Sequence, residues 1–302
     1  ITIDANDNIY VIDYGRNCAN CTVMIERIDN KGRLGKPWQP QTKDGNVISP
    51  QDIAVDAMNH VYLTAPRHSQ VFKFDNGGNI LDVWGSERPV SGQFVEPFGI
   101  WIDQEGYFYI TDVGLDSFQK FDKNRTFMIT RGKSSVEAFL YSGNDLAVDN
   151  QRYIYITIDS KVQKFDPDGN FVLSWGERGT SPKQFDKPLG LDIDKTGRVF
   201  VADFGNHRIQ VFDTDGDLKL VRGTKGILNG QFDTPRDVAG GINGQIYVAD
   251  SGNYRIQVLD SNGEYSRTWG AKGNGNGEFA NLLEIDIDSS ENIFTVDGNS
   301  FI

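Results

Sequence analysis

The sequence has little of what marks membrane, metal or nucleic-acid proteins. No apolar run approaches the ~20 residues that span a bilayer, so membrane insertion is not expected. No H-E-x-x-H, P-loop or G-x-S-x-G pattern occurs. Of the three histidines, none shares a sequence phase with another, which makes a poor zinc site: His60, His68 and His207. Lys and Arg number 30 against 42 Asp and Glu, for a net charge of −12, which disfavours a nucleic-acid partner.

What the sequence does have is self-similarity at a period of about 47 residues. Acidic residues end a series of "I-x-I-D"-like segments, with Gly241 in one place: Asp4, Asp56, Asp103, Asp149, Asp194 and Asp288. Six residues after each of these seven positions stands an aromatic residue: Tyr10, Tyr62, Tyr109, Tyr155, Phe200, Tyr247 and Phe294. Because only 12% of the chain is aromatic, chance does not explain this phase. We expect these rings on the second strand of each unit, largely buried between neighbouring units.

Each repeat reads as four short strands. A segment such as R-I-Q-V-F-D is followed by a turn rich in Gly and Asp, by a strand that ends in W-G or R-G, and by a loop with G-Q-F or a variant. No stretch keeps a 3.6-residue period, so almost no helix is expected. The sequence therefore predicts an all-β fold, a β-propeller of four-stranded blades. There are seven repeat openings, which gives seven blades by count, with six as the alternative.

Residues 1–302 are predicted to form a single propeller domain. The last repeat stops at Ile302, where its third strand is due to start, so this domain is expected to be truncated in that repeat. The chain also begins inside a strand pattern and without Met, and we expect further residues before Ile1.

Residues 188–213 and 235–260 resemble the NHL repeat nearly letter for letter. They read P-L-G-L-D-I-D-K-T-G-R-V-F-V-A-D-F-G-N-H-R-I-Q-V-F-D and P-R-D-V-A-G-G-I-N-G-Q-I-Y-V-A-D-S-G-N-Y-R-I-Q-V-L-D. The resemblance extends more loosely over the rest of the chain. It implies a propeller in a family that most often closes with six blades. It leaves function open, because the family includes RNA-binding modules, sensors, interaction scaffolds and a few enzymes.

Two acid–base pairs recur in phase within these strongest repeats. Asp203 precedes Arg208 by five residues, and Asp250 precedes Arg255 by the same interval. They could face a ligand, but their recurrence across a strand-to-strand turn favours structural ion pairs that pin the turn.

The only two cysteines, Cys18 and Cys21, lie in an insertion within the first repeat. A loop disulfide in an oxidising compartment is favoured over half of a zinc knuckle or two free thiols. No His follows Cys21, which excludes a c-type haem attachment. The disulfide in turn predicts an extracellular, periplasmic or cell-surface location.

A ring of carboxylates is the candidate metal site. Four residues before the anchor position stand Asp52, Asp145, Asp237 and Glu284, with Gly99 and Gly190 between them. Equivalent repeat positions map onto one ring, so these acids are expected to converge at one mouth of the propeller. Converging carboxylates raise one another's pKa unless a cation intervenes, and oxygen ligands suit calcium. The alternative is that Asp and Gly simply suit this entry turn.

The sequence favours a binding scaffold over an enzyme. We expect loops that present a surface to a protein, glycan or cationic ligand, with calcium as the one candidate cofactor. The alternative is a lyase or lactonase-like hydrolase that uses a divalent cation in the axial tunnel, as some similar propellers do. The oligomeric state is not predicted.

Overall fold

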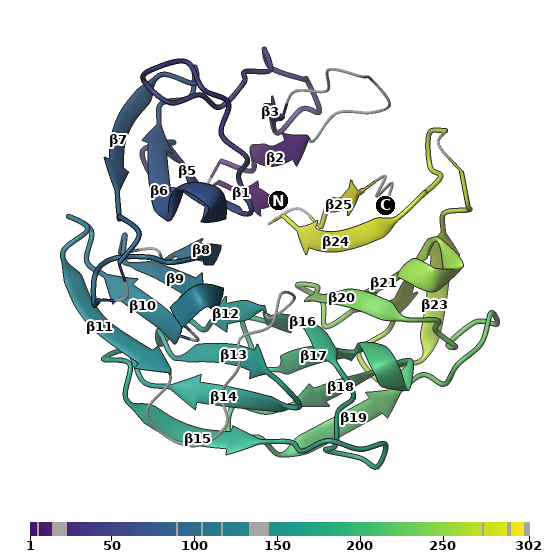
Figure 1. The fold of residues 1–302 in the computed structure, drawn as a ribbon. Coiled ribbons are helices and arrows are strands. Elements are labelled where there is room, and N and C mark those ends of the chain that lie inside the picture. The colour runs from purple at the N-terminus through teal and green to yellow at the C-terminus, as the bar shows by residue number, and fades with distance from the viewer. Residues whose placement is uncertain are drawn as a thin grey trace. The chain divides into compact units, whose positions relative to one another are not determined.

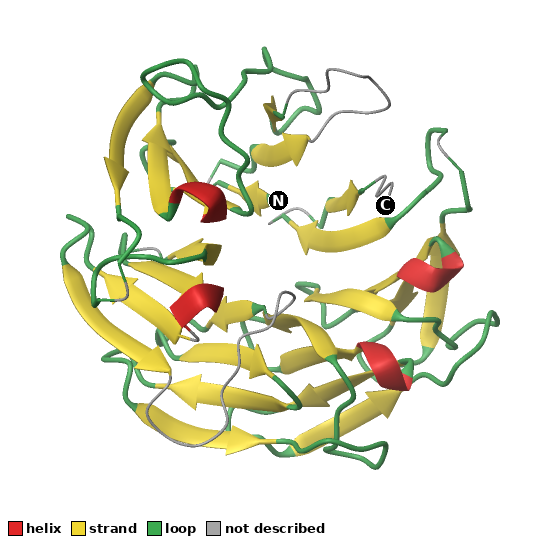
Figure 2. Cartoon of the chain, in the orientation of Figure 1, coloured by secondary structure: helices red, strands yellow, loops and turns green. Residues whose placement is uncertain are grey.

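The computed structural model describes residues 1–4, 6–13, 23–88, 90–103, 105–115, 117–132, 145–273, 275–288 and 291–298. Two compact units divide the chain, residues 1–142 and 143–302, and each is described by itself. Both are built from antiparallel strands, as Figures 1 and 2 show. The helices among the described residues are single 3-10 turns, and none of them has the length and apolar character to cross a membrane. The all-β prediction is confirmed.

The first unit holds three sheets. Their strands, in chain order, are β1 Thr2–Ile3, β2 Ile9–Asp13 and β3 Met24–Ile28; β4 Ile53–Val55, β5 Val61–Ala65, β6 Gln70–Phe74 and β7 Ile80–Trp84; and β8 Pro97–Ile102, β9 Phe108–Asp112, β10 Ser117–Phe121 and β11 Phe127–Gly132. Two 3-10 turns, η1 Pro66–His68 and η2 Val113–Leu115, follow second strands.

The second unit holds four sheets. Their strands are β12 Leu146–Val148, β13 Ile154–Ile158, β14 Lys161–Phe165 and β15 Phe171–Trp175; β16 Pro188–Ile193, β17 Val199–Asp203, β18 Arg208–Phe212 and β19 Leu218–Arg222; β20 Pro235–Gly240, β21 Ile246–Asp250, β22 Arg255–Leu259 and β23 Tyr265–Trp269; and β24 Leu282–Ile287 with β25 Ile293–Asp297. The turns η3 Phe204–Asn206 and η4 Ser251–Asn253 follow β17 and β21.

Seven sheets correspond to the seven repeat openings, but they are not equally complete. Within the described residues, five sheets have four strands, the first has three and the last has two. The six-bladed alternative therefore agrees with the six sheets of three or four strands. The described residues of the seventh opening form two strands, β24 and β25.

The acidic anchor of each repeat is a turn-capping residue. Asp56 illustrates the pattern: its Oδ1 accepts the backbone N–H groups of Met58 and His60, and its Oδ2 accepts the Tyr62 hydroxyl at 2.8 Å. The same bond joins Asp103 to Tyr109 and Asp149 to Tyr155, each at 3.1 Å. Such side-chain acceptors satisfy turn donors that the sheet leaves unpaired.

Where the repeat has no tyrosine hydroxyl, another side chain donates to the anchor acid. In the fifth repeat the aromatic is Phe200, which has no hydroxyl, and Arg198 Nε donates to Asp194 Oδ2 at 2.7 Å instead. In the last repeat, where the aromatic is Phe294, Asn292 Nδ2 donates to Asp288 Oδ2, also at 2.7 Å. The six-residue spacing thus records a hydrogen bond between anchor and ring in four of the five tyrosine repeats. In the fifth, where the anchor is Gly241, the Tyr247 hydroxyl donates to Gln245 Oε1 at 2.7 Å instead.

The in-phase aromatics occupy the second residue of the second strand in all seven sheets. Six of the seven are at most 2% exposed, and Phe294 is half-buried. They pack across sheet boundaries: the cluster around Phe200 includes Val238 of the following first strand, and the cluster around Tyr155 includes Leu191. The predicted core positions are confirmed.

Candidate functional site

The loops that lead from the fourth strand of one sheet to the first strand of the next are held at their base by a glycine–phenylalanine contact. We call residues 176–187, 223–234 and 270–281 of the second unit the inter-blade loops. Gly223 has φ +106, and a Cβ there would lie 2.4 Å from the buried ring of Phe232. The pairs Gly176–Phe185 and Gly270–Phe279 are built in the same way. The W-G or R-G and G-Q-F motifs are therefore one structural device, in which the glycine leaves room for the ring.

The middle of each loop is held by a polar network from the next sheet. In the loop 176–187, the Arg208 guanidinium donates to the carbonyls of Thr180, Ser181 and Gln184 at 2.6–2.8 Å. Its Nε forms an ion pair with Asp203 Oδ2 at 2.7 Å. Asp203 is fully buried and also accepts the side-chain amides of Asn206 and Gln210. Arg208, Asn206 and Gln210 together donate five side-chain hydrogen bonds to backbone carbonyls of this loop.

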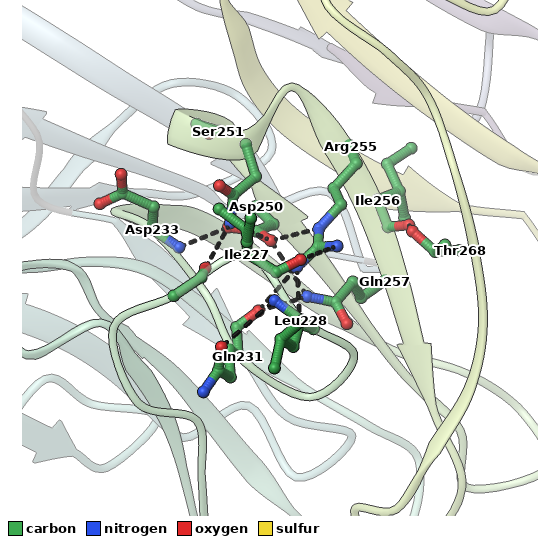
Figure 3. Close-up of polar contacts among 12 residues, drawn as sticks. Ile227, Leu228, Gln231, Asp233, Asp250, Ser251, Arg255, Ile256, Gln257 and Thr268 are labelled. Atoms are coloured by element: carbon green, nitrogen blue, oxygen red, sulfur yellow. Dashed lines mark hydrogen bonds and ion pairs between the residues drawn. The ribbon is translucent and has the colours of Figure 1, made fainter.

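The same network recurs one repeat later (Figure 3). Arg255 pairs with the buried Asp250 at 2.7 Å and donates to the carbonyls of Ile227, Leu228 and Gln231 at 2.8–2.9 Å. Asn253, Gln257 and the backbone N–H of Asp233 complete it. The two predicted ion pairs are thus confirmed. Besides pinning their own turns, they fix the course of the preceding inter-blade loop.

The tips of these two loops differ in chemistry although their backbones share one pattern of bonds. The first presents Thr180 and Ser181, whereas the second presents Ile227 and Leu228, which are 75% and 66% exposed. Arg178 and Lys225 occupy the same place in the two loops. Each forms an isolated backbone β-bridge with the phenylalanine of its loop, and Lys272 forms the equivalent bridge in the third loop. Sequence reasoning missed this surface, because tip residues follow no repeat.

The predicted ring of carboxylates is used for bonding between sheets. Asp52, Asp145 and Asp237 each accept the N–H of the next residue with Oδ1 at 2.8 Å. Each also accepts, with Oδ2 at 2.9 Å, a backbone N–H of the following repeat's first strand, from Ile100, Leu191 and Ile285 respectively. The carboxylates therefore link first strands within each unit. Glu284, the fourth member, lies on β24 and is exposed.

In the second unit two further acids, Asp192 and Asp286, were not predicted. Gly190 leaves no side chain at the ring position of its repeat, and a Cβ there would lie 2.1 Å from Asp237 Oδ1. Asp192, two residues on, takes over the bond by accepting the Gly240 N–H at 2.8 Å. The hydrogen bond between neighbouring first strands is thus present in this repeat too, but the acid that accepts it stands two positions further along the strand.

Burial and mutual repulsion raise the pKa values of these acids. Burial is the main reason that the pKa of Asp237 lies well above its usual range, and the charges of Asp145 and Glu284 raise it further. Burial, together with the charge of Asp192, raises the pKa of Asp286 to about 6. Within the second unit, the charges of neighbouring acids therefore add to the effect of burial on these pKa values.

Asp286→Asn is expected to raise the free energy of unfolding at pH 7. A folded-state pKa of about 6 exceeds the unfolded value of ~3.9, so the stability linked to this proton is complete below pH ~4 and is lost as the pH rises through 6. Asn keeps an acceptor for the Ile287 N–H, which Oδ1 accepts at 2.7 Å, and carries no charge. Urea unfolding at pH 4, 5, 6 and 7 should show a flatter profile than the wild type.

The control is Asp213→Asn, for which the expected change in the free energy of unfolding has the opposite sign. Lys219 beside it lowers the pKa of Asp213, so this variant should lose stability at pH 7. If Asp286→Asn loses stability at pH 7 as well, the raised pKa of Asp286 is wrong.

The described residues do not form a ready-made metal cage. Among them, no group of three or more His, Cys, Asp or Glu side chains is placed to hold an ion. Three of the four predicted ligands already accept two backbone N–H groups each. His60 bonds to Asp56 at 2.9 Å and His207 lies 3.1 Å from Asp233, in different units. Cys18 and Cys21 lie outside the described residues.

Two family models match the sequence. Residues 185–212 match the NHL repeat and residues 240–300 match a model described as "6-bladed beta-propeller". Human NHL repeat-containing protein 3 is 29% identical over 211 residues, which are 61% of this chain and 56% of that protein. A Caenorhabditis elegans protein named "Probable peptidyl-alpha-hydroxyglycine alpha-amidating lyase pgal-1" is 29% identical over 140 residues, covering 43% of this chain and 39% of its own length. The chain thus spans about half the length of the curated relatives or less.

Among solved structures, that of a streptogramin B lyase has a TM-score of 0.71 at 14% identity, over 97% of this chain and 88% of the other. At this identity the likeness concerns the fold alone. Sequence repeats, sheet order and family models agree: the chain is an all-β propeller that carries NHL repeats.

Proposed function

We propose that this protein is a protein-binding scaffold that presents its inter-blade loops to a partner. The observation that carries the proposal is the pair of arginine networks. Arg208 and Arg255 each use a buried ion pair and three carbonyl bonds to hold one loop in a single conformation. Loops ordered before binding lose little further entropy when a partner docks, which favours recognition.

The test replaces residues 180–183 and 227–229 with serine, which keeps the backbone carbonyls that the arginines bind. Both forms are immobilised, crosslinked in an extract of the source organism and compared by quantitative mass spectrometry. We expect a set of proteins recovered by the wild type and depleted at least about tenfold with the loop variant. Recovery of the same proteins by both forms would contradict a role of these loops in binding.

An enzymatic role is the second candidate, and the matched lyase from C. elegans is the observation in its favour. Its printed name gives the substrate to assay, a peptide with a C-terminal α-hydroxyglycine. The scaffold proposal expects no peptide amide above the uncatalysed rate, with zinc or calcium added. Turnover by the wild type that the loop variant retains would favour the enzyme.

Calcium binding by Asp52, Asp145, Asp237 and Glu284, which the sequence pattern predicts, is untested, and a thermal experiment decides between it and the purely structural role of these acids. A cation bound only by the folded state raises the melting temperature. Because three of these acids already bond to backbone N–H groups, we expect equal melting temperatures in calcium and in EDTA. A calcium-dependent rise that Asp145→Asn with Asp237→Asn removes would instead establish the cation site.

We further propose that the protein acts outside the cytosol, at the cell surface, in a periplasm or in the extracellular space. The support is the disulfide expected between Cys18 and Cys21. Titration of the unfolded, unreduced protein with a thiol reagent should find no free thiol, and two after reduction. Since the loop closed is short, the stabilising effect should be modest. Two thiols before reduction would remove the support for this location.

A further inference from the structure

We propose that Ile227 and Leu228 are the anchor of the binding surface, inserted into an apolar pocket of a protein partner whose rim carries carboxylates. This inference rests on the proposed function and gives it a site and a partner chemistry. Both side chains lie at the tip of the inter-blade loop 223–234, which Figure 3 shows against Arg255 and Gln231.

The fold does not need apolar residues at this tip. The preceding inter-blade loop places Thr180 and Ser181 at the same positions and binds them through the same arginine bonds. In both loops the bonds reach only backbone carbonyls, so the side chains are not part of the structural network. Two adjacent large apolar side chains that are 75% and 66% exposed therefore call for an explanation outside the fold.

The tip is preorganised in the way that binding hot spots are. Arg255 fixes the carbonyls of Ile227 and Leu228, and the Gln231 side chain accepts the Leu228 N–H at 3.2 Å. The Gly230 N–H, on the far side of the tip, donates to Gln257 Oε1 at 2.9 Å. A rigid apolar tip fills a shaped pocket with little loss of conformational entropy, which a fluid lipid surface would not require.

The charges around the tip indicate the rim of the partner's pocket. Lys225 is exposed two residues before Ile227, and Arg178 and Lys272 are exposed at the same position of the loops on either side. No ion pair involves any of the three within the described residues, although Lys272 lies 4.9 Å from the centre of the Tyr254 ring. In the second unit this position holds three cations, whereas the first unit has Glu87 there. In a chain of net charge −12, the three cations of the second unit complement a carboxylate rim. Two copies of so acidic a chain repel each other, which disfavours self-association.

The test replaces the two tip residues with those at the same positions of the loop 176–187, as Ile227→Thr with Leu228→Ser. Because the loop 176–187 carries this dipeptide in the same network, the variant should keep the wild-type melting temperature. The probe is a displayed library of random peptides selected on the wild-type full chain, from which one enriched peptide is synthesised. We expect this peptide to contain both apolar and acidic residues. Its Kd for the double variant should be at least about tenfold higher than its Kd for the wild type. Lys225→Glu should raise Kd several-fold and weaken the salt dependence.

Val172→Thr is the matched control, since Val172 is an exposed apolar residue of β15 outside the loop. It should leave Kd unchanged. The proposal is overturned if the double variant binds the peptide like the wild type, or if no apolar and acidic peptide is enriched. It is also overturned if the double variant loses binding to vesicles of phosphatidylserine and phosphatidylcholine, or loses self-association in light scattering. Crosslinked partners that depend on residues 180–183 alone would keep the scaffold proposal and reject this anchor.

Discussion

Phe200→Ala is expected to lower the free energy of unfolding by about 3–5 kcal/mol, the range for removing a buried phenylalanine. The ring is fully buried and packs with Val238, Ile246 and Val248 of the next sheet, as well as with Ala202 of its own strand. Its loss leaves a cavity between two sheets that neither can close without moving. Urea unfolding monitored by far-ultraviolet circular dichroism measures the change.

Two variants sharpen this test. Phe294→Ala removes the equivalent ring from the last, two-stranded sheet, where it is half-buried, and should cost less. Gly240→Ala would place a Cβ 2.6 Å from the Phe200 ring and should destabilise the wild type. In the Phe200→Ala background that conflict is gone, so the two changes should be less than additive. Equal costs for the rings at 200 and 294 would contradict the packing argument.

The repeat phase was readable from the sequence because one local interaction produces it in most repeats. An anchor such as Asp103 binds the turn N–H groups two and four residues on and the Tyr109 hydroxyl six residues on. All of these partners lie within one turn, so spacing alone reveals them. Where the ring is Phe200, Arg198 replaces the hydroxyl as donor, and the phase survives the change of partner.

The sequence pattern picked out Asp52, Asp145 and Asp237 by their shared phase, but the bonds that they make could not be read from it. Asp145 and Asp237 bond to N–H groups of Leu191 and Ile285, which stand a whole repeat away. A backbone donor has no sequence signature, so these acids looked available for a cation. Asp192 escaped notice because Gly190, made necessary by the approach of Asp237, shifts its repeat's acid by two residues.

The loop surface was missed for a different reason. The motif that holds the loop, Asp250 with Arg255, was visible, but its reach back to the carbonyls of Ile227 and Leu228 was not. Within the described part of the chain, no hydrogen bond involves the side chains of Ile227 and Leu228, so the repeat does not constrain them. Periodicity therefore does not predict which residues stand at these tips.

Asp203→Ala should lower the free energy of unfolding by about 3–5 kcal/mol, because it removes one partner of a buried ion pair. Asp203 is fully buried and Arg208 is 9% exposed at its side chain, with 2.7 Å between Oδ2 and Nε. The change also leaves Gln210, Asn206 and the Asp186 N–H without this acceptor. Burial raises the pKa of Asp203 even though hydrogen bonds from Asn206, the Asp186 N–H and Arg208 lower it, which shows how strongly desolvation acts at this position.

A second substitution separates the unpaired charge from the lost packing. Asp203→Ala with Arg208→Met removes the guanidinium that the single variant leaves unpaired, so the double variant should be less destabilised than the sum of the two single variants. Arg208→Met alone should also free the carbonyls of Thr180, Ser181 and Gln184 and speed amide exchange across residues 177–186. The loop 224–233, which Arg255 holds, is the internal reference and should exchange as in the wild type. Additive costs, or equal exchange in both loops, would show that this ion pair does not order the inter-blade loop.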